Sequence, residues 1–210
     1  MHLARPNLVA ATARGWLAGP LLFAALVSPS LEASAGQSLV IHHLAHWLMV
    51  LAGAVMGYQL RELRRVNAPT VVAWAGLGAA LLWHLPPLLS WAESHPVAHM
   101  FAHATLVAGG GAMGWAVPKL EAGGRAALFI AGTVVMWPLM LAELAGAFAY
   151  TGYPGQAASA GVVELVAMPG AWLVLAFWGP IHRLFSRPVA AAVAQAVLAV
   201  VAVLGWTAAI

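Results

Sequence analysis

Long apolar runs separated by short polar links dominate the chain. A helix that crosses a membrane needs about 20 consecutive, mostly apolar residues, and seven runs fit that requirement. The runs cover residues 15–34, 38–58, 70–91, 97–117, 125–150, 158–180 and 187–209. This pattern predicts an all-α fold: one polytopic bundle of seven transmembrane helices over residues 1–210, with no room for a soluble domain.

Two of these runs carry the same pattern of histidine, methionine and glycine, 57 residues apart. The pattern is His42, His46, Gly53, Met56 and Gly57 in one run, and His99, His103, Gly110, Met113 and Gly114 in the other. At 3.6 residues per turn, the histidines and glycines of each set fall on one narrow face of a helix. Because glycines four residues apart let membrane helices approach closely, we expect the two faces to meet and bring four histidines together.

The composition supports a lipid environment. Hydrophobic residues make up 63% of the chain and charged residues 7%, whereas soluble domains carry roughly 25% charged residues. The isoelectric point near 10 reflects where the few basic residues lie and does not indicate a nucleic-acid partner. We expect an integral, multi-pass protein of a bacterial or archaeal cytoplasmic membrane, with the lipid bilayer as its solvent.

The nine basic residues occupy alternate links between the runs. They are Arg5, Arg14, Arg61, Arg64, Arg65, Lys119, Arg125, Arg183 and Arg187. Because cytoplasmic loops are enriched in Lys and Arg, this placement predicts a cytoplasmic N-terminus and an extracytoplasmic C-terminus.

The first run, 15–34, also resembles a signal peptide. Two arginines precede it, and an Ala-Ser-Ala sequence at 33–35 matches the small residues of a cleavage site. Cleavage would leave six spans with the same orientation. We expect the helix to be retained.

In this topology most of the ionisable residues inside the membrane fall in its outer half. Such residues are rare and usually mark functional sites. Seven of the ionisable residues in the outer half form our candidate metal site, within a histidine-bearing core at 38–180. They are His42, His46, His84, His99, His103, Glu143 and Glu164.

Neighbouring residues receive other interpretations. His43 points about 100° away from His42 on a helix, and we interpret it as structural. Met49 could add a thioether ligand for Cu(I) or be ordinary core. His95 precedes Pro96 and is expected at the outer mouth. Cysteine is absent, so a metal would bind through imidazole, carboxylate, thioether or water.

A further set of motifs resembles the CtaG-type cytochrome c oxidase assembly factors. Residues 83–87 read Trp-His-Leu-Pro-Pro, and a helix with His99 and His103 follows, ending near Trp115. An earlier helix has the same histidine spacing, and residues 168–170 read Met-Pro-Gly. A compact membrane family of unknown function shares this histidine layout and is the alternative assignment. The chain departs from the assembly factors in its shorter length and in Gly53 and Gly57, where they often have paired prolines.

The resemblance implies a membrane protein that helps to deliver copper to haem-copper oxidases. Its partners would be oxidase subunits or extracytoplasmic copper carriers. We expect metal binding ahead of catalysis, and the sequence leaves enzymatic turnover open. Imidazole suits copper, zinc and iron, so the residues and the resemblance agree on a metal, with copper ahead of zinc.

Three alternatives stay open. Histidines from different helices could ligate one haem b in an electron-transfer subunit, with Gly53 or Gly110 making room for the porphyrin. A zinc hydrolase would need an open zinc position and a general base such as Glu143 or Glu164, but neither histidine pair has the His-Glu-x-x-His form. The chain could also be a structural subunit of a larger respiratory complex.

Overall fold

A computed structural model of the protein describes residues 17–60, 68–145, 153, 155–156, 158–159, 161–166, 170 and 188–208. All regular structure within these residues is helical, which confirms the all-α prediction for this part of the chain. The helices are α2 (Ala18–Leu26), α3 (Pro29–Ala35), α4 (Leu39–Leu60), α5 (Pro69–Leu82), α6 (Pro86–Ser94), α7 (Pro96–Ala116), the 3-10 turn η1 (Val117–Lys119), α8 (Ala122–Leu144) and α11 (Pro188–Thr207).

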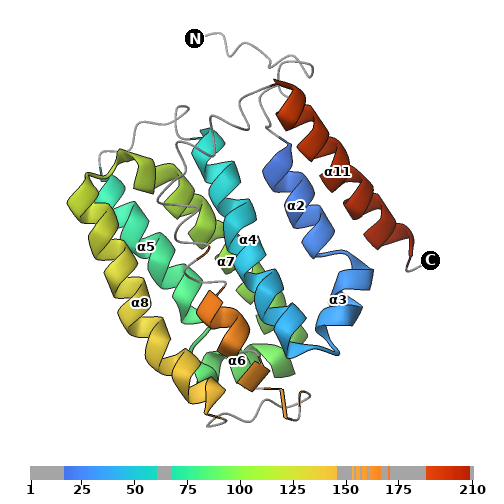
Figure 1. The fold of residues 1–210 in the computed structure, drawn as a ribbon, viewed down its shortest axis with the longest axis horizontal. Coiled ribbons are helices and arrows are strands. Elements are labelled where there is room, and N and C mark those ends of the chain that lie inside the picture. The colour runs from blue at the N-terminus through green and yellow to red at the C-terminus, as the bar shows by residue number, and fades with distance from the viewer. Residues whose placement is uncertain are drawn as a thin grey trace.

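The pair α4 and α7 forms the centre of the bundle (Figure 1). On one side α5 packs against α7 and α8 packs against α5, while on the other side α2 packs against α4 and α11 against α2. The short helix α6 packs against α7 at one end. In their most apolar stretches 61% of α4 is buried, against 22% of α8 and 17% of α11, so the outer helices present their apolar side chains outward, as lipid-facing helices do.

The predicted contact between the two glycine-bearing faces is confirmed. A Cβ atom added to Gly53 would lie 2.8 Å from the carbonyl carbon of Val107, and one added to Gly110 would lie 2.8 Å from that of Val50. Side chains are therefore excluded from both positions, and the two backbones touch as in other small-residue membrane interfaces.

Two of the predicted spans are bent rather than continuous. Run 15–34 becomes α2 and α3, which meet at 56°, and run 70–91 becomes α5 and α6, which meet at 64°. Prolines explain both breaks, because the residue before a proline is pushed out of the helical conformation. Ser28, before Pro29, has ψ 143°, and Leu85, before Pro86, has ψ 125°.

By length and composition, three of the described helices can cross a membrane, or five if each bent pair counts as one span. They are α4, α8 and α11, joined by the pairs α2–α3 and α5–α6. The central helix α7 is long enough to cross a membrane, but its histidines and glycines make it less apolar than these spans. Most of the expected span 158–180 lies outside the described residues, so the seven-span topology stays a prediction.

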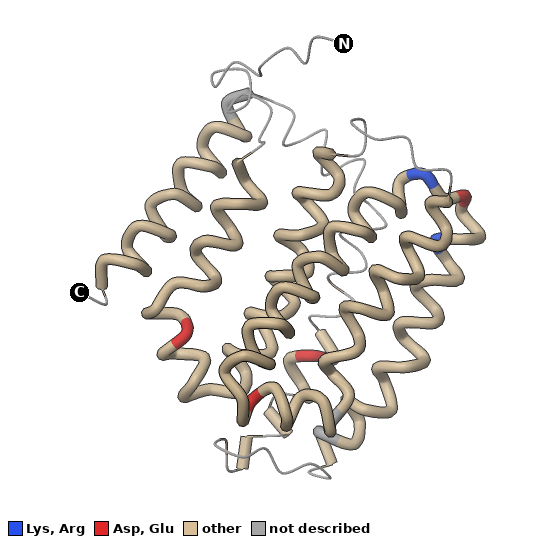
Figure 2. The backbone as a smooth tube through the Cα atoms, turned by 180° about the vertical axis from the view of Figure 1, so that it is seen from behind, with Lys and Arg blue, Asp and Glu red and all other residues tan. Residues whose placement is uncertain are grey.

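Most acidic residues of the described bundle lie at the end opposite to its basic residues (Figure 2). The basic residues within this part of the chain, Lys119 and Arg125, lie at one end together with one acidic residue, and the other acidic positions lie towards the opposite end. The histidines of α4 and α7 belong to the latter end, because they occupy the first two turns of α4 and of α7. The candidate site is thus an acidic and imidazole-rich end of the molecule.

Candidate metal centre

The two histidine pairs lie face to face across the α4–α7 contact. The ring centroids of His42 and His99 are 5.5 Å apart, and those of His46 and His103 are 5.3 Å apart. Each pair is also close within its own helix, since histidines one turn apart share a face. The glycine contact lower in the two helices sets this spacing, because it fixes how closely the backbones approach.

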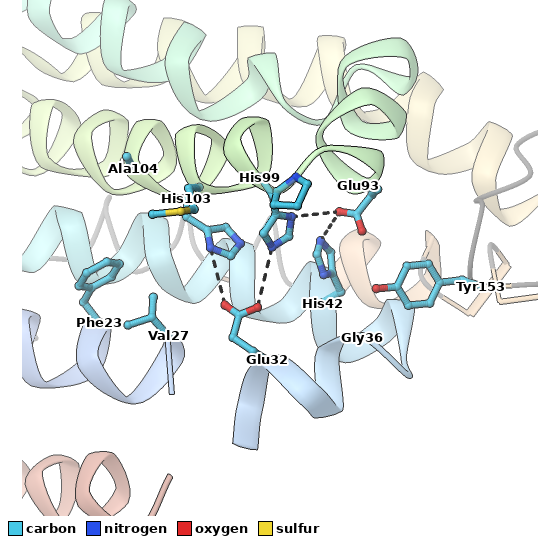
Figure 3. A pocket seen from close by; sticks show the side chains of 12 residues that line it. Phe23, Val27, Glu32, Gly36, His42, Glu93, His99, His103, Ala104 and Tyr153 are labelled. Atoms are coloured by element: carbon cyan, nitrogen blue, oxygen red, sulfur yellow. Dashed lines mark ion pairs between the residues drawn. The ribbon is translucent and has the colours of Figure 1, made fainter. Parts of the chain in front are cut away.

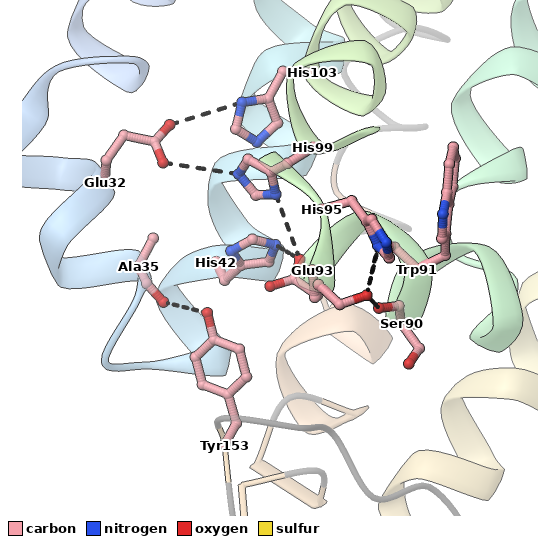
Figure 4. Close-up of polar contacts among 11 residues, drawn as sticks. Glu32, Ala35, His42, Ser90, Trp91, Glu93, His95, His99, His103 and Tyr153 are labelled. Carbon is pink, nitrogen blue, oxygen red and sulfur yellow. Dashed lines mark hydrogen bonds and ion pairs between the residues drawn. The ribbon is translucent and has the colours of Figure 1, made fainter. Parts of the chain in front are cut away.

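Two glutamates join the histidines from the bent helices. Glu32 comes from α3, with its carboxylate oxygens 3.8 Å from Nε2 of His99 and 3.7 Å from Nδ1 of His103. Glu93 comes from α6, and its Oε1 lies 2.8 Å from Nε2 of His42 and 3.8 Å from Nδ1 of His99 (Figures 3 and 4). The proline-induced bends place both carboxylates at the end of the α4–α7 pair where the histidines are.

These five side chains line one pocket of about 760 Å³. Figure 3 shows the polar residues together at one side of the pocket, and Phe23 and Val27 at the other. Tyr153 closes the polar side, where its hydroxyl donates a hydrogen bond of 2.9 Å to the backbone oxygen of Ala35. Burial, together with the Glu93 and Glu32 carboxylates, raises the pKa of Tyr153 to about 12, so the hydroxyl stays a donor at physiological pH.

The pocket contains two groups of side chains that could hold a metal ion. One is Glu32, His99 and His103, and the other is His42, Glu93 and His99. Within each group the candidate ligand atoms lie within 4.8 Å of one another. Two atoms bound to one zinc-like ion at 2.0–2.2 Å are at most about 4.4 Å apart, so small side-chain movements would allow coordination in either group.

His46 lies directly behind the pocket. Its ring centroid is 4.3 Å from that of His42 and 5.3 Å from that of His103. The side chain is buried, and within the described part of the chain its Nε2 has no hydrogen-bond partner. The structure therefore places His46 against the pocket histidines but in neither three-residue group.

His84 and Glu164 form a separate, deeper cluster with His43. Oε1 of Glu164 lies 2.9 Å from Nδ1 of His43 and 3.7 Å from Nε2 of His84. The opposite nitrogen of the His84 ring donates to the backbone oxygen of Ala80 at 3.0 Å. All three side chains are at most 5% exposed, and this buried carboxylate with its histidines is part of the core. The side chain of Glu143 lies outside the part of the chain that the structure describes.

Sequence reasoning missed three residues of the pocket: Glu32, Glu93 and Tyr153. Glu32 offered a signal, since it is an ionisable residue inside a predicted membrane run. Glu93 falls just beyond the run 70–91, and Tyr153 lies in a link, where an interfacial aromatic is expected. Neither offered a comparable signal.

The other side chains singled out in the sequence lie away from the pocket. His43 pairs with Glu164, in keeping with its structural interpretation. Met49 is 1% exposed within the core, and it is not among the residues that line the pocket. His95 is exposed at the start of α7, where its Nδ1 lies 3.0 Å from the backbone oxygen of Trp91 and 2.9 Å from the hydroxyl of Ser94.

Comparison with known proteins gives a family without a known activity. No curated protein and no solved structure is significantly similar to the chain. One family profile, described as a protein of unknown function (DUF1404), matches residues 17–171. The match includes every residue of the pocket and of the buried cluster, and it covers well over half of the chain. The chain is therefore a member of the DUF1404 family.

Proposed function

We propose that this protein is a membrane metal-binding protein that handles a transition metal, with copper as the leading candidate, in the pocket between α3, α4, α6 and α7. The bundle would have seven spans, with a cytoplasmic N-terminus and the pocket at the extracytoplasmic end. The charge distribution supports this orientation, because the basic end would face the cytoplasm under the positive-inside rule and the acidic end would face outward.

A single observation carries the proposal: three histidines and two glutamates converge on one pocket at ligand-compatible distances. Residues of this kind are costly inside a membrane protein unless they pair or bind something. No Lys or Arg is among the described residues that line this pocket, so the two carboxylates have no permanent cation beside them there. A metal cation would supply the missing positive charge.

The ligand chemistry limits the choice of metal. Imidazole suits copper, zinc, iron and nickel, and carboxylate oxygen favours harder, divalent ions over Cu(I). Since the pocket combines both, it suits Cu(II), Zn(II) or Fe(II). Copper leads because of the resemblance to the CtaG-type assembly factors, which rests on residues 83–87 and on both histidine pairs.

The exposure of the ligands suits exchange rather than permanent storage. The side chain of Glu32 is 39% exposed and that of His99 is 24% exposed, whereas that of His42 is 5% exposed. An ion could thus be received or released at the Glu32 side while the opposite side holds it. This asymmetry fits a protein that passes copper between an extracytoplasmic carrier and a haem-copper oxidase.

The role in oxidase assembly is tested in cells that express the protein, or a variant of it, from the chromosomal locus of its own gene. We expect His42→Ala and His103→Ala to leave oxidase subunits in the membrane but to lower their copper content and activity. His95→Ala is the matched control, because His95 lies at the same end of the bundle and outside the pocket. Normal copper in the oxidase of cells carrying both pocket substitutions would contradict a role in assembly.

A further inference from the structure

His99 belongs to both of the candidate metal-binding groups, and it faces them with different atoms. Its Nε2 lies 3.8 Å from the carboxylate of Glu32, while its Nδ1 lies 3.8 Å from the carboxylate of Glu93 (Figure 4). The two nitrogens of an imidazole ring point in diverging directions, so they cannot serve one ion together. The ring stands between two half-sites: Glu32 with His103 on one side, and Glu93 with His42 on the other.

Each half-site is already close to the geometry that an ion requires. Two ligands at about 2.1 Å from the same ion lie about 3.0 Å apart at a right angle and about 4.2 Å apart on opposite sides. The contacts on the Glu32 side, 3.7 and 3.8 Å, and on the Glu93 side, 2.8 and 3.8 Å, fall in or next to this range. The two half-sites therefore need no rearrangement of the helices to bind.

The charge of the pocket also favours a second ion. Each half-site has one carboxylate, and no Lys or Arg is among the described residues that line the pocket. An ion bound only on the Glu32 side would leave the Glu93 carboxylate, which is 13% exposed, without a cation in a poorly solvated place, and this is costly. A second ion on the opposite side of His99 compensates that charge, and a pocket of about 760 Å³ has room for both ions and their water ligands.

We propose that the pocket is a dinuclear metal centre in which the ring of His99 bridges two ions. This inference rests on the proposed metal-binding function and adds a second site and a bridging ligand to it. Bridging uses both ring nitrogens as donors, so neutral His99 releases its single N–H proton to water when the second ion binds. Glu32 and His103 complete the protein ligands of one ion, and Glu93 and His42 complete those of the other.

Copper(II) alone, added to the purified full chain in detergent, provides the test. Two paramagnetic ions joined by one imidazole ring couple magnetically, so we expect two coppers per chain by elemental analysis and an integrated electron paramagnetic resonance signal well below that copper content. Glu32→Gln and Glu93→Gln should each leave one copper per chain, with a signal that now equals the copper content. His99→Ala should lose the coupling and weaken both sites, whereas His95→Ala should behave as wild type.

The copper content and signal of the wild-type protein test the bridged centre even if a variant fails to fold. One copper per chain, or two coppers whose signal equals the copper content, would overturn the bridged centre and leave single-ion binding intact. No bound copper would overturn the bridged centre together with the copper-handling function proposed above.

Discussion

The contact between α4 and α7 predicts that Gly53→Ala destabilises the protein, although alanine is the better helix former. The added Cβ would lie 2.8 Å from the carbonyl carbon of Val107, and ordinary contacts begin at 3.4 Å. The helices must therefore separate locally by at least the difference, 0.6 Å. Overpacking of this kind costs about 1–3 kcal/mol.

Gly78→Ala is the matched control. Gly78 lies in α5, is exposed, and has no atom within 4 Å of an added Cβ. Both substitutions gain the same helix preference, about 0.5–1 kcal/mol, so the difference between the two variants isolates the steric cost. For a chain of this size 1 kcal/mol shifts the thermal midpoint by about 2–4 °C. We expect the Gly53→Ala midpoint to lie about 2–12 °C below that of Gly78→Ala.

The assay is thermal unfolding in one detergent at one scan rate, because membrane proteins often unfold irreversibly and the midpoint then depends on the rate. Copper binding of the two variants is measured in parallel, because the methyl group added at Gly53 also moves the histidines of α4 relative to those of α7. Equal midpoints, or a more stable Gly53→Ala variant, would refute the close approach of the two helices on which the pocket depends.

Three other predictions follow from the same structure. Glu164→Leu leaves the buried His43 without its carboxylate, which costs about 3–5 kcal/mol when a buried pair is broken; the thermal midpoint should fall well below that of the exposed Glu121→Leu control, and a midpoint equal to the control would contradict the buried pair. Tyr153→Phe removes the hydrogen bond to Ala35, worth about 1 kcal/mol. Because the pKa of Tyr153 is raised from 10.0 to about 12, its neutral hydroxyl stabilises the fold fully below pH 10, and this stabilisation is lost as the pH rises through 12. The wild type should therefore unfold at a higher temperature than Tyr153→Phe at pH 8 and lose that advantage as the pH approaches 12; an advantage that stays constant up to pH 12 would count against the raised pKa. Removing bound metal with a chelator should lower the midpoint, since an ion present at 100 times its dissociation constant stabilises by about 2.7 kcal/mol; an unchanged midpoint after verified removal would argue against binding to the folded state.

The helical character of the described chain and its central contact could be predicted from the sequence. Both depend on local rules: the length of an apolar run, the 3.6-residue period, and the ability of glycine to admit a neighbouring backbone. The repeat of His42 and His46 as His99 and His103 was informative for this reason. Identical faces with glycines at the same offset can meet in register, and in the structure they do.

The carboxylates of the pocket could not be predicted in the same way. A proline marks where a helix breaks, but the direction of the new segment depends on what it packs against. Glu32 and Glu93 reach the histidines only because α3 and α6 turn towards the same end of the α4–α7 pair. Glu164 shows the converse: its depth in a predicted span suggested the metal site, but the structure pairs it with His43 on another side of α4.

The metal content of the purified protein tests the central claim most directly. The full chain, prepared in detergent without added chelator, would be exposed in turn to copper, zinc and iron, freed of loosely bound ions, and analysed for metal and for visible absorption. We expect at least one tightly bound transition-metal ion per chain, retained by His95→Ala and lost from a variant that combines His99→Ala with His103→Ala. A wild-type protein that retains none of these ions, or one that retains them equally well without His99 and His103, would contradict the claim that this pocket is a metal centre.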